Sequence, residues 1–300
     1  LTGAEAMVQD TRDPIVMDPG LRMIQAVDTE TNATLGTLVA WANHPETLWS
    51  DNLYISSDFP HYLREGIEKG VYNGEELVQA GLGGVAVYIN GAIGGLMTTR
   101  ASMPLDDPFL DTTYTEASFD KAKAQGERLA MLALSALENP DTLVQQASLS
   151  VRAKTLNLPL ENNMFRLASM MGILDFGMTG WFKTRSEVAA FTVGPASFIS
   201  VPGEIYPEIV NGGVEAPEGQ DFPISAVEDP PLRDLMPGDY KFVIALANDE
   251  IGYILPKSQW DVDLPFTYAR EKAPYGEENS LGPETAPLLH KEFQNILKDL

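Results

Sequence analysis

Short apolar runs alternate along the chain with clusters of turn residues, which predicts an alternation of strands and helices. Strands are expected at residues 21–27, 35–42, 84–90, 144–158, 187–201 and 240–247, and the turn 28–32 makes the first two an antiparallel pair. Helical spacing of apolar residues covers 58–69, 118–137, 161–174 and 285–300. No linker interrupts this alternation. We therefore expect an α/β fold, with a mixed sheet flanked by helices, in a single domain over residues 1–300.

Three of the apolar strands are followed by side chains of types that bind metals. His44 follows the run 38–42, Glu204 follows the strand that Pro202-Gly203 ends, and Tyr253 follows the run 240–247. Functional side chains gather beyond strand ends in open α/β sheets, so these three are expected to converge on one cleft. Imidazole and carboxylate are ordinary zinc ligands, and a dication lowers the pKa of a bound tyrosine. A solvated loop position explains each residue taken singly, and the pattern alone leaves both interpretations open.

A glycine-rich turn follows the strand that ends at Asn90. Its sequence, Gly91-Ala92-Ile93-Gly94-Gly95, allows backbone N–H groups to face a ligand. We take Asn90, Gly94 and Gly95 as candidate substrate-binding residues. No Gly-Lys-Ser/Thr follows, so the turn does not match a phosphate-binding loop.

Two further stretches have two interpretations each. The acidic loop 104–114 is either a calcium site or a solvated loop. The methionine-rich stretch either packs into the core or lines a lipophilic entrance; it contains Met164, Met170, Met171, Met178, Trp181 and Phe182. His61 lies off the apolar stripe of its helix and His290 lies on the closing helix, so both are expected on the surface.

The charge of the chain narrows the classes of partner. The formal net charge is −23, from 43 acidic and 20 basic residues. This charge argues against nucleic acid and against an anionic membrane as the primary partner, so membrane contact is expected to be peripheral at most. The chain has no cysteine, which excludes disulfides and thiolate metal sites. No apolar run has the length of a membrane-spanning helix.

Four segments, in order, resemble the catalytic domain of the neutral/alkaline ceramidase family. They are Trp41-Ala42-Asn43-His44-Pro45, Val201-Pro202-Gly203-Glu204, Leu246-Ala247-Asn248 with Gly252-Tyr253, and Tyr275-Gly276-Glu277-Glu278-Asn279-Ser280-Leu281-Gly282-Pro283. Each motif alone is weakly specific, but their order and approximate spacing agree over nearly the whole chain.

The resemblance implies a zinc-dependent amidase of lipid metabolism. In that family two histidines, a glutamate and a tyrosine hold one zinc ion, and the matching positions here are His44, Glu204 and Tyr253. Tyr275 matches a tyrosine that polarises the scissile amide carbonyl. The implied substrate is a small-molecule or lipid-like N-acyl compound, and the implied location is secreted or periplasmic.

Two departures from the family pattern change this expectation. The family's first histidine ligand lies in an upstream Thr-His-Thr-His-type motif, whereas this chain has three histidines and none before His44. We therefore expect an N-terminal segment, or a partner chain, to supply a further histidine. Gly95 stands where the family has a serine, which excludes a serine nucleophile at that position. The alternative function is a catalytically impaired binding or interaction protein that keeps the ceramidase fold.

Overall fold

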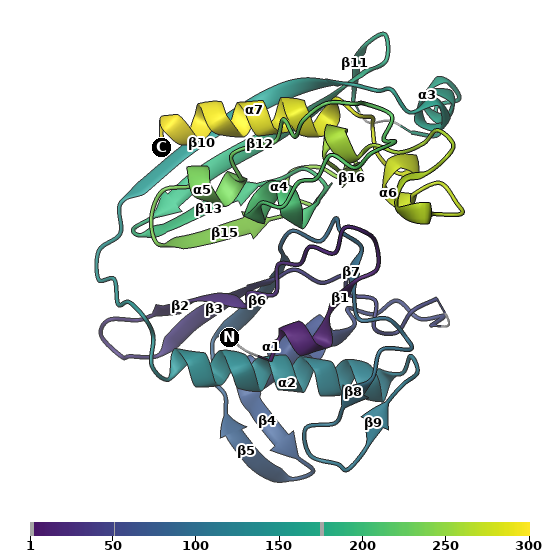
Figure 1. Cartoon of the computed structure of the whole chain (residues 1–300). Helices are drawn as coiled ribbons and strands as arrows, with labels where there is room; N and C mark the ends of the chain where they lie inside the picture. Colours follow the sequence, from purple (N-terminus) through teal and green to yellow (C-terminus); the bar gives the residue numbers. More distant parts are fainter. Residues whose placement is uncertain (1–2, 51, 175–176) are drawn as a thin grey trace. The chain divides into compact units, whose positions relative to one another are not determined.

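The computed structural model describes residues 3–50, 52–174 and 177–300 (Figure 1). The chain divides into two compact units, which we describe separately. Unit 1 comprises Leu1–Thr11, Pro19–Gly91 and Met97–Leu143, and unit 2 comprises Arg12–Asp18, Ala92–Leu96 and Val144–Leu300. A single domain over residues 1–300 stays a prediction.

The main sheet of unit 1 has three strands in the order β2-β3-β6. Strands β2 (Arg22–Val27) and β3 (Thr34–Trp41) form the antiparallel pair that the sequence predicts, and β6 (Val85–Asn90) runs parallel to β3. The buried side chains of β3 include Val39 and Trp41, and Ala86 of β6 is buried as well. The sheet is therefore mixed, with an apolar face.

Two helices of unit 1 pack against each other. Asp58 caps α1 (Phe59–Lys69), and Ser118 caps α2 (Phe119–Leu137) by accepting a hydrogen bond from the Lys121 amide. Each helix therefore begins directly after its capping residue. Gly126 allows the close contact, because a Cβ there would lie 2.6 Å from the Phe59 carbonyl oxygen.

Short elements complete unit 1. They are the 3-10 helix η1 (Glu5–Met7) and the antiparallel pairs β1 (Gln9–Asp10) with β7 (Met97–Thr98), β4 (Gly70–Asn73) with β5 (Glu76–Ala80), and β8 (Leu105–Asp106) with β9 (Thr113–Tyr114).

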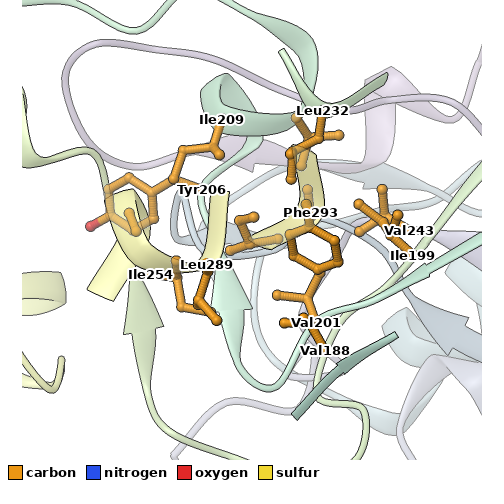
Figure 2. Packing of buried hydrophobic residues seen from close by; sticks show 14 of the residues in the cluster. Val188, Ile199, Val201, Tyr206, Ile209, Leu232, Val243, Ile254, Leu289 and Phe293 are labelled. Atoms are coloured by element: carbon orange, nitrogen blue, oxygen red, sulfur yellow. The ribbon is translucent and has the colours of Figure 1, made fainter. Parts of the chain in front are cut away.

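Unit 2 is built on a five-stranded mixed sheet. Strands β10 (Leu149–Pro159), β12 (Lys183–Val193) and β13 (Ala196–Ser200) are antiparallel neighbours, β15 (Tyr240–Ile244) runs parallel to β13, and β11 (Met178–Gly180) pairs with β12. Helix α7 (Thr285–Lys298) packs on β10 and β12. The apolar core of this unit lies between α7 and the sheet, where Phe293 and Leu289 lie among Val188, Ile199 and Val243 (Figure 2).

The remaining elements of unit 2 are short. They are α3 (Asn163–Met170), β14 (Glu204–Ile205), α4 (Pro207–Asn211), α5 (Leu232–Leu235), β16 (Tyr253–Ile254), η2 (Lys257–Gln259), η3 (Thr267–Ala269) and α6 (Tyr275–Glu278). The predicted mixed α/β fold class is thus confirmed. Among the described residues, no helix is both long and apolar enough to cross a bilayer.

Two local predictions in unit 2 are wrong. The helix expected over 161–174 covers only Asn163–Met170, because Asn162 is its N-cap and Gly172, with a φ of +68°, leaves the helical conformation. No residue of this helix is buried, so the interpretation of the methionine-rich stretch as core packing is wrong for α3. His290 is buried rather than exposed. It lies on α7, and its Nε2 is 2.8 Å from the Pro230 carbonyl oxygen.

Candidate functional site

Glu204 and Tyr253 are direct neighbours in unit 2. The parallel strands β13 and β15 each break and then continue as the short strands β14 and β16, which are also parallel. In this pair Glu204 lies opposite Tyr253. The break and the restart bring two oxygen donors to the same point beyond the main sheet.

Close backbone contacts hold these two strand ends together. A Cβ on Gly203 would collide with the Gly252 carbonyl oxygen, and a Cβ on Gly252 would collide with the carbonyl oxygen of Asn279. Gly252 also has a φ of +87°, a backbone conformation that residues other than glycine rarely adopt. The two glycines are therefore structural requirements of the Glu204–Tyr253 pair.

Three tyrosine rings line up beside Glu204. The rings of Tyr206 and Tyr253 meet edge to face at 6.3 Å, and those of Tyr253 and Tyr275 meet edge to face at 5.7 Å. Tyr253 is buried, whereas Tyr275, at the start of α6, is 57% exposed. The structure thus brings Glu204, Tyr253 and Tyr275 together, with Tyr275 on the solvent side.

A buried ion pair supports the innermost ring. Both terminal nitrogens of Arg12 donate to the Glu208 carboxylate, at 2.7 and 2.6 Å, and the guanidinium lies 4.1 Å from the centre of the Tyr206 ring. Glu208 is fully buried, so this bidentate pair fixes the geometry of the region.

The glycine-rich turn packs against this support. A Cβ on Gly95 would lie 2.8 Å from an Arg12 nitrogen, so Arg12 occupies the space that a side chain at this position would need. The Gly94 N–H donates to the Ile205 carbonyl at 2.9 Å. In contrast to the expectation for this turn, that amide is directed at the protein's own backbone and not at a ligand.

The electrostatics of unit 2 favour neutral forms of two buried groups. Burial, then the charge of Glu204 and a hydrogen bond to it, raise the pKa of the Tyr253 hydroxyl. Burial raises the pKa of the Glu277 carboxyl to about 8, despite the charges of Arg270 and Arg12. One Glu277 oxygen has no hydrogen-bond partner among the residues described.

His44 lies in unit 1, three residues after the end of β3. Its backbone N–H donates to the Met97 carbonyl at 2.9 Å, and its Nδ1 is 2.7 Å from the same oxygen. A carbonyl oxygen only accepts, so Nδ1 carries the proton and Nε2 carries the lone pair of the neutral ring. This tautomer is the one in which a histidine ligates a metal through Nε2.

A buried polar network anchors the strand end that carries His44. The Asn43 amide donates to Thr99 at 2.8 Å, Gln125 donates to the same hydroxyl at 2.8 Å, and Thr99 donates to the Met7 carbonyl at 2.5 Å. Thr47 donates to Gln125 at 2.5 Å. This network orients the segment around His44 through side-chain hydrogen bonds.

Asn90 lies at the end of β6 and lines an open groove of unit 1. The groove has a volume of about 510 Å³, and its polar lining includes Arg64, Tyr88, Ser56 and Ser57. The Asn90 side-chain oxygen is buried and has no hydrogen-bond partner within the described part of the chain.

The donor chemistry of the predicted ligands suits zinc, since Glu204 and Tyr253 supply adjacent oxygens and His44 supplies an imidazole in the ligating tautomer. In residues 3–50, 52–174 and 177–300, no group of three or more His, Cys, Asp or Glu side chains is arranged to hold a metal. The predicted ligand set is of a different kind, because one of its three members is a tyrosine.

The acidic loop of unit 1 uses its carboxylates to close turns. Asp107 accepts hydrogen bonds from the amides of Phe109 and Leu110, both at 2.8 Å, and from the Tyr114 hydroxyl at 2.9 Å. Asp106 accepts from Thr113 at 2.6 Å. Asp106 and Asp107 therefore stabilise turns within the loop.

The fold is that of a ceramidase-like α/β protein. The chain is similar in structure to neutral ceramidase from Pseudomonas aeruginosa, with a TM-score of 0.60 and 15% sequence identity over 94% of this chain and 46% of that one. It is also similar to a ceramidase complexed with C2, with a TM-score of 0.58 and 15% identity over 94% and 48% of the two chains. No family model and no curated protein matches the sequence.

These similarities confirm the ceramidase-like fold that the four motifs predict. The chain spans about half the length of the solved structures it matches. The roles assigned to individual residues stay predictions.

The sequence did not predict the support formed by Arg12, Tyr206 and Glu208. Arg12 and Glu208 are 196 residues apart, and no local pattern links them. The one available signal was the spacing of Glu208, which lies four residues after Glu204 in the same segment.

Proposed function

We propose that this protein is a zinc-dependent hydrolase that cleaves an amide or a related acyl bond. Glu204, Tyr253 and His44 would hold the zinc ion, and Tyr275 would act on the substrate. The observation that carries the proposal is the juxtaposition of Glu204, Tyr253 and Tyr275 at one strand end. The ceramidase-like fold supports the same reaction class.

Hydrolysis of an N-acyl bond adds water to the carbonyl carbon and releases a carboxylic acid and an amine. A bound zinc ion supplies a Lewis acid, which lowers the pKa of water towards about 7. Tyr275, exposed at the start of α6, donates its hydroxyl proton in a hydrogen bond to the carbonyl oxygen as negative charge develops there. Gly95 provides no nucleophile, so water is the attacking group.

The neighbouring residues keep the reacting groups in place. The Arg12–Glu208 pair holds Tyr206, and the Tyr206 ring contacts Tyr253. Tyr253 in turn contacts Tyr275, so the hydroxyl that meets the substrate is positioned through a chain of ring contacts. We propose an N-acyl compound of small-molecule or lipid-like character as the substrate.

The experiment measures release of free amine from a panel of N-acyl amines that includes a ceramide. Tyr275→Phe is expected to lower kcat by about 10²-fold with little change in KM, as for loss of one oxyanion donor. Tyr268→Phe is the matched control, because Tyr268 lies in the same part of the chain but donates to Glu215. Its kinetics are expected to match those of the unsubstituted protein.

Equal rates for Tyr275→Phe and the unsubstituted protein would contradict the role of Tyr275. Tight binding of an intact N-acyl compound, without release of amine from any member of the panel, would favour a binding protein that keeps the fold.

A further inference from the structure

Strand β6 is an outer strand of the main sheet of unit 1. The strand order is β2-β3-β6, and among the described residues no strand pairs with β6 on the side away from β3. The edge of a sheet presents backbone N–H and C=O groups to which another extended backbone can bind. The groups that are free along this edge therefore define which ligand it can take.

Alternate residues of β6 face the free edge. Directly after the strand, the Gly91 N–H donates to the Trp41 carbonyl at 3.0 Å, so Gly91 faces β3. Successive residues of a strand direct their backbone groups to opposite sides, and Asn90 and Tyr88 therefore face away from β3. Within the described part of the chain, the backbone N–H and C=O groups of these two residues have no hydrogen-bond partner.

Ala86 faces the same edge, but side chains already pair with it. Its N–H donates to the Glu68 carboxylate and its carbonyl accepts from Arg64 Nε, both at 2.8 Å. Arg64 and Glu68 both lie on α1, and their charged groups are 3.9 Å apart. These two side chains take the place of a neighbouring strand at Ala86, so the free edge is limited to Tyr88 and Asn90.

The open groove of unit 1 runs along this free edge. Its volume of about 510 Å³ lies in the range of small-ligand sites. Val85 and Val87, which line it, are 59% and 47% exposed and offer apolar contact to a ligand. Arg64 is the charged residue of the lining, and its guanidinium is already paired with Glu68. The groove therefore selects its ligand through backbone groups and apolar contact, and not through charge.

The Asn90 end of the groove lies beside the segment that carries His44. Asn90 is in register with Trp41, three residues before His44, and Pro45 lines the groove. The Tyr88 hydroxyl donates to the Asn43 carbonyl at 3.2 Å. A ligand that binds along β6 therefore reaches the neighbourhood of His44 with one of its ends.

The spacing of the free groups selects the chemistry of the ligand. Each of Tyr88 and Asn90 offers one N–H and one C=O, and residues two apart in a strand are separated by about 6.8 Å. An extended peptide carries the complementary groups at the same repeat, whereas a simple N-acyl amine has a single amide. The Asn90 side-chain oxygen, buried and without a partner among the described residues, can accept one more N–H.

We propose that this groove binds the peptide part of an N-acylated peptide, with the acyl bond at the Asn90 end. The proposal rests on the proposed function and names its substrate class. Water adds to the acyl carbonyl carbon and the C–N bond breaks. The acyl group leaves as a carboxylic acid, and the nitrogen takes a proton and becomes the N-terminal amine of the peptide. A second copy of β6 would meet only two free residues, far less contact than a stable dimer needs.

The direct test is amide hydrogen exchange measured by NMR with hexanoyl-Val-Ala-Val-amide, in the presence of a chelator that prevents turnover. At saturating peptide, exchange of the Tyr88 and Asn90 amides is expected to slow by about tenfold or more, because each gains a hydrogen-bond partner. The Ile89 amide faces β3 and is the internal control. Its exchange is expected to change by less than about twofold.

The ligand provides a second control, which leaves the protein unchanged. The peptide is methylated in turn at each of its nitrogens, and its dissociation constant is measured by calorimetry. Strand pairing predicts an alternating result, in which methylation of nitrogens that face β6 weakens binding by about tenfold. Methylation of the intervening nitrogen is expected to change binding by less than about twofold, because that N–H faces away from β6.

The apolar contact is tested with a pair of valine variants. Val87→Ser is expected to weaken peptide binding by about fivefold, because less apolar area is buried. Val27→Ser is the matched control, since Val27 is 41% exposed on β2, at the opposite edge of the sheet. It is expected to bind the peptide normally. Circular dichroism of each variant confirms that it is folded.

Turnover separates this proposal from the proposed function. Without chelator, kcat/KM for hexanoyl-Val-Ala-Val-amide is expected to exceed that for hexanoyl-ethylamine, which has one amide, by about tenfold or more. Protection of Tyr88 and Asn90 without acid release from any N-acyl compound would overturn the proposed function alone. Amine release from a ceramide, with no protection of either residue by the peptide, would overturn the peptide groove alone.

Two further results would overturn the proposal. One is equal binding of all the methylated peptides, because pairing with a strand edge requires the alternation. The other is protection of Tyr88 and Asn90 that rises with protein concentration in the absence of peptide, which would assign the edge to a second copy of the chain.

Discussion

Units 1 and 2 each present a polar residue at the end of a buried strand, but they hold the strand end in different ways. In unit 1 the segment around His44 is held by side chains, through the hydrogen bonds of Asn43 and Thr99. In unit 2 the segment around Glu204 packs closely against neighbouring backbone. This packing is possible because Gly203 and Gly252 have no side chains. The first arrangement depends on polar groups finding partners, and the second depends on close backbone packing.

The two strand ends should therefore be destabilised by different kinds of substitution. Adding a methyl group should damage unit 2, whereas removing a hydrogen bond should damage unit 1. The buried charges differ as well, since unit 2 buries Glu277 with an unusual pKa and unit 1 buries Lys121 among carbonyl oxygens. Three predictions test these contrasts.

The largest effect is expected from Gly252→Ala. The added Cβ would collide with the Asn279 carbonyl oxygen, and the φ of +87° adds backbone strain. We expect the free energy of unfolding to fall by about 3–5 kcal/mol, measured by denaturant titration. The matched variant is Gly83→Ala in unit 1, where φ is +73° and nothing lies within 4 Å of the new Cβ. It should lose only about 1–2 kcal/mol. Equal losses for both variants would show that strain, and not packing, dominates.

A smaller effect is expected from Lys121→Met in unit 1. The ammonium of Lys121 is buried and donates to the carbonyl oxygens of Arg100, Ala101 and Met103, at 2.9, 2.8 and 2.6 Å. Its loss leaves three acceptors without this donor, so we expect about 2–4 kcal/mol of destabilisation. Lys123→Met, at an exposed position on the same helix, should change stability by no more than about 0.5 kcal/mol. A stable Lys121→Met variant would mean that other donors replace the ammonium.

The smallest effect concerns the pH dependence of unit 2. The Glu277 carboxyl has its pKa raised from 4.5 to about 8, so the folded state keeps its proton over a pH range in which the unfolded chain loses it. The group therefore contributes stability that is fully present below pH 4.5 and lost as pH rises through about 8. Glu277→Gln should remove this dependence. The difference in unfolding free energy between variant and unsubstituted protein should change by on the order of 1–3 kcal/mol across that range. A difference that stays constant with pH would contradict a protonated Glu277.

The elements that the sequence predicts best are those with local signals. Helices α1 and α2 begin at their capping residues, and the β2–β3 pair follows from two apolar runs and a short turn. Helix α3 is shorter than predicted, and at its start the backbone N–H groups of Glu161 and Asn162 donate to the distant Leu281 carbonyl. Such a long-range contact leaves no trace in local periodicity.

In the candidate site, too, the features with local sequence signals are predicted and those that depend on long-range contacts are not. The strand-end pattern singles out Glu204 and Tyr253, and the structure pairs them in the short parallel strands β14 and β16. The contact of Arg12 with Glu208 joins residues 196 positions apart, and burial of His290 depends on the Pro230 carbonyl. Neither follows from composition or spacing, because both depend on how separate segments meet.

We propose that Glu204, Tyr253 and His44 hold zinc while Tyr275 acts on the substrate. The most direct measurement is the zinc content of purified protein after exposure to zinc and removal of excess metal, for the unsubstituted chain, Glu204→Gln and Tyr275→Phe. We predict stoichiometric zinc in the unsubstituted protein and in Tyr275→Phe, and a loss of zinc in Glu204→Gln. Stoichiometric zinc that persists in Glu204→Gln would contradict the account.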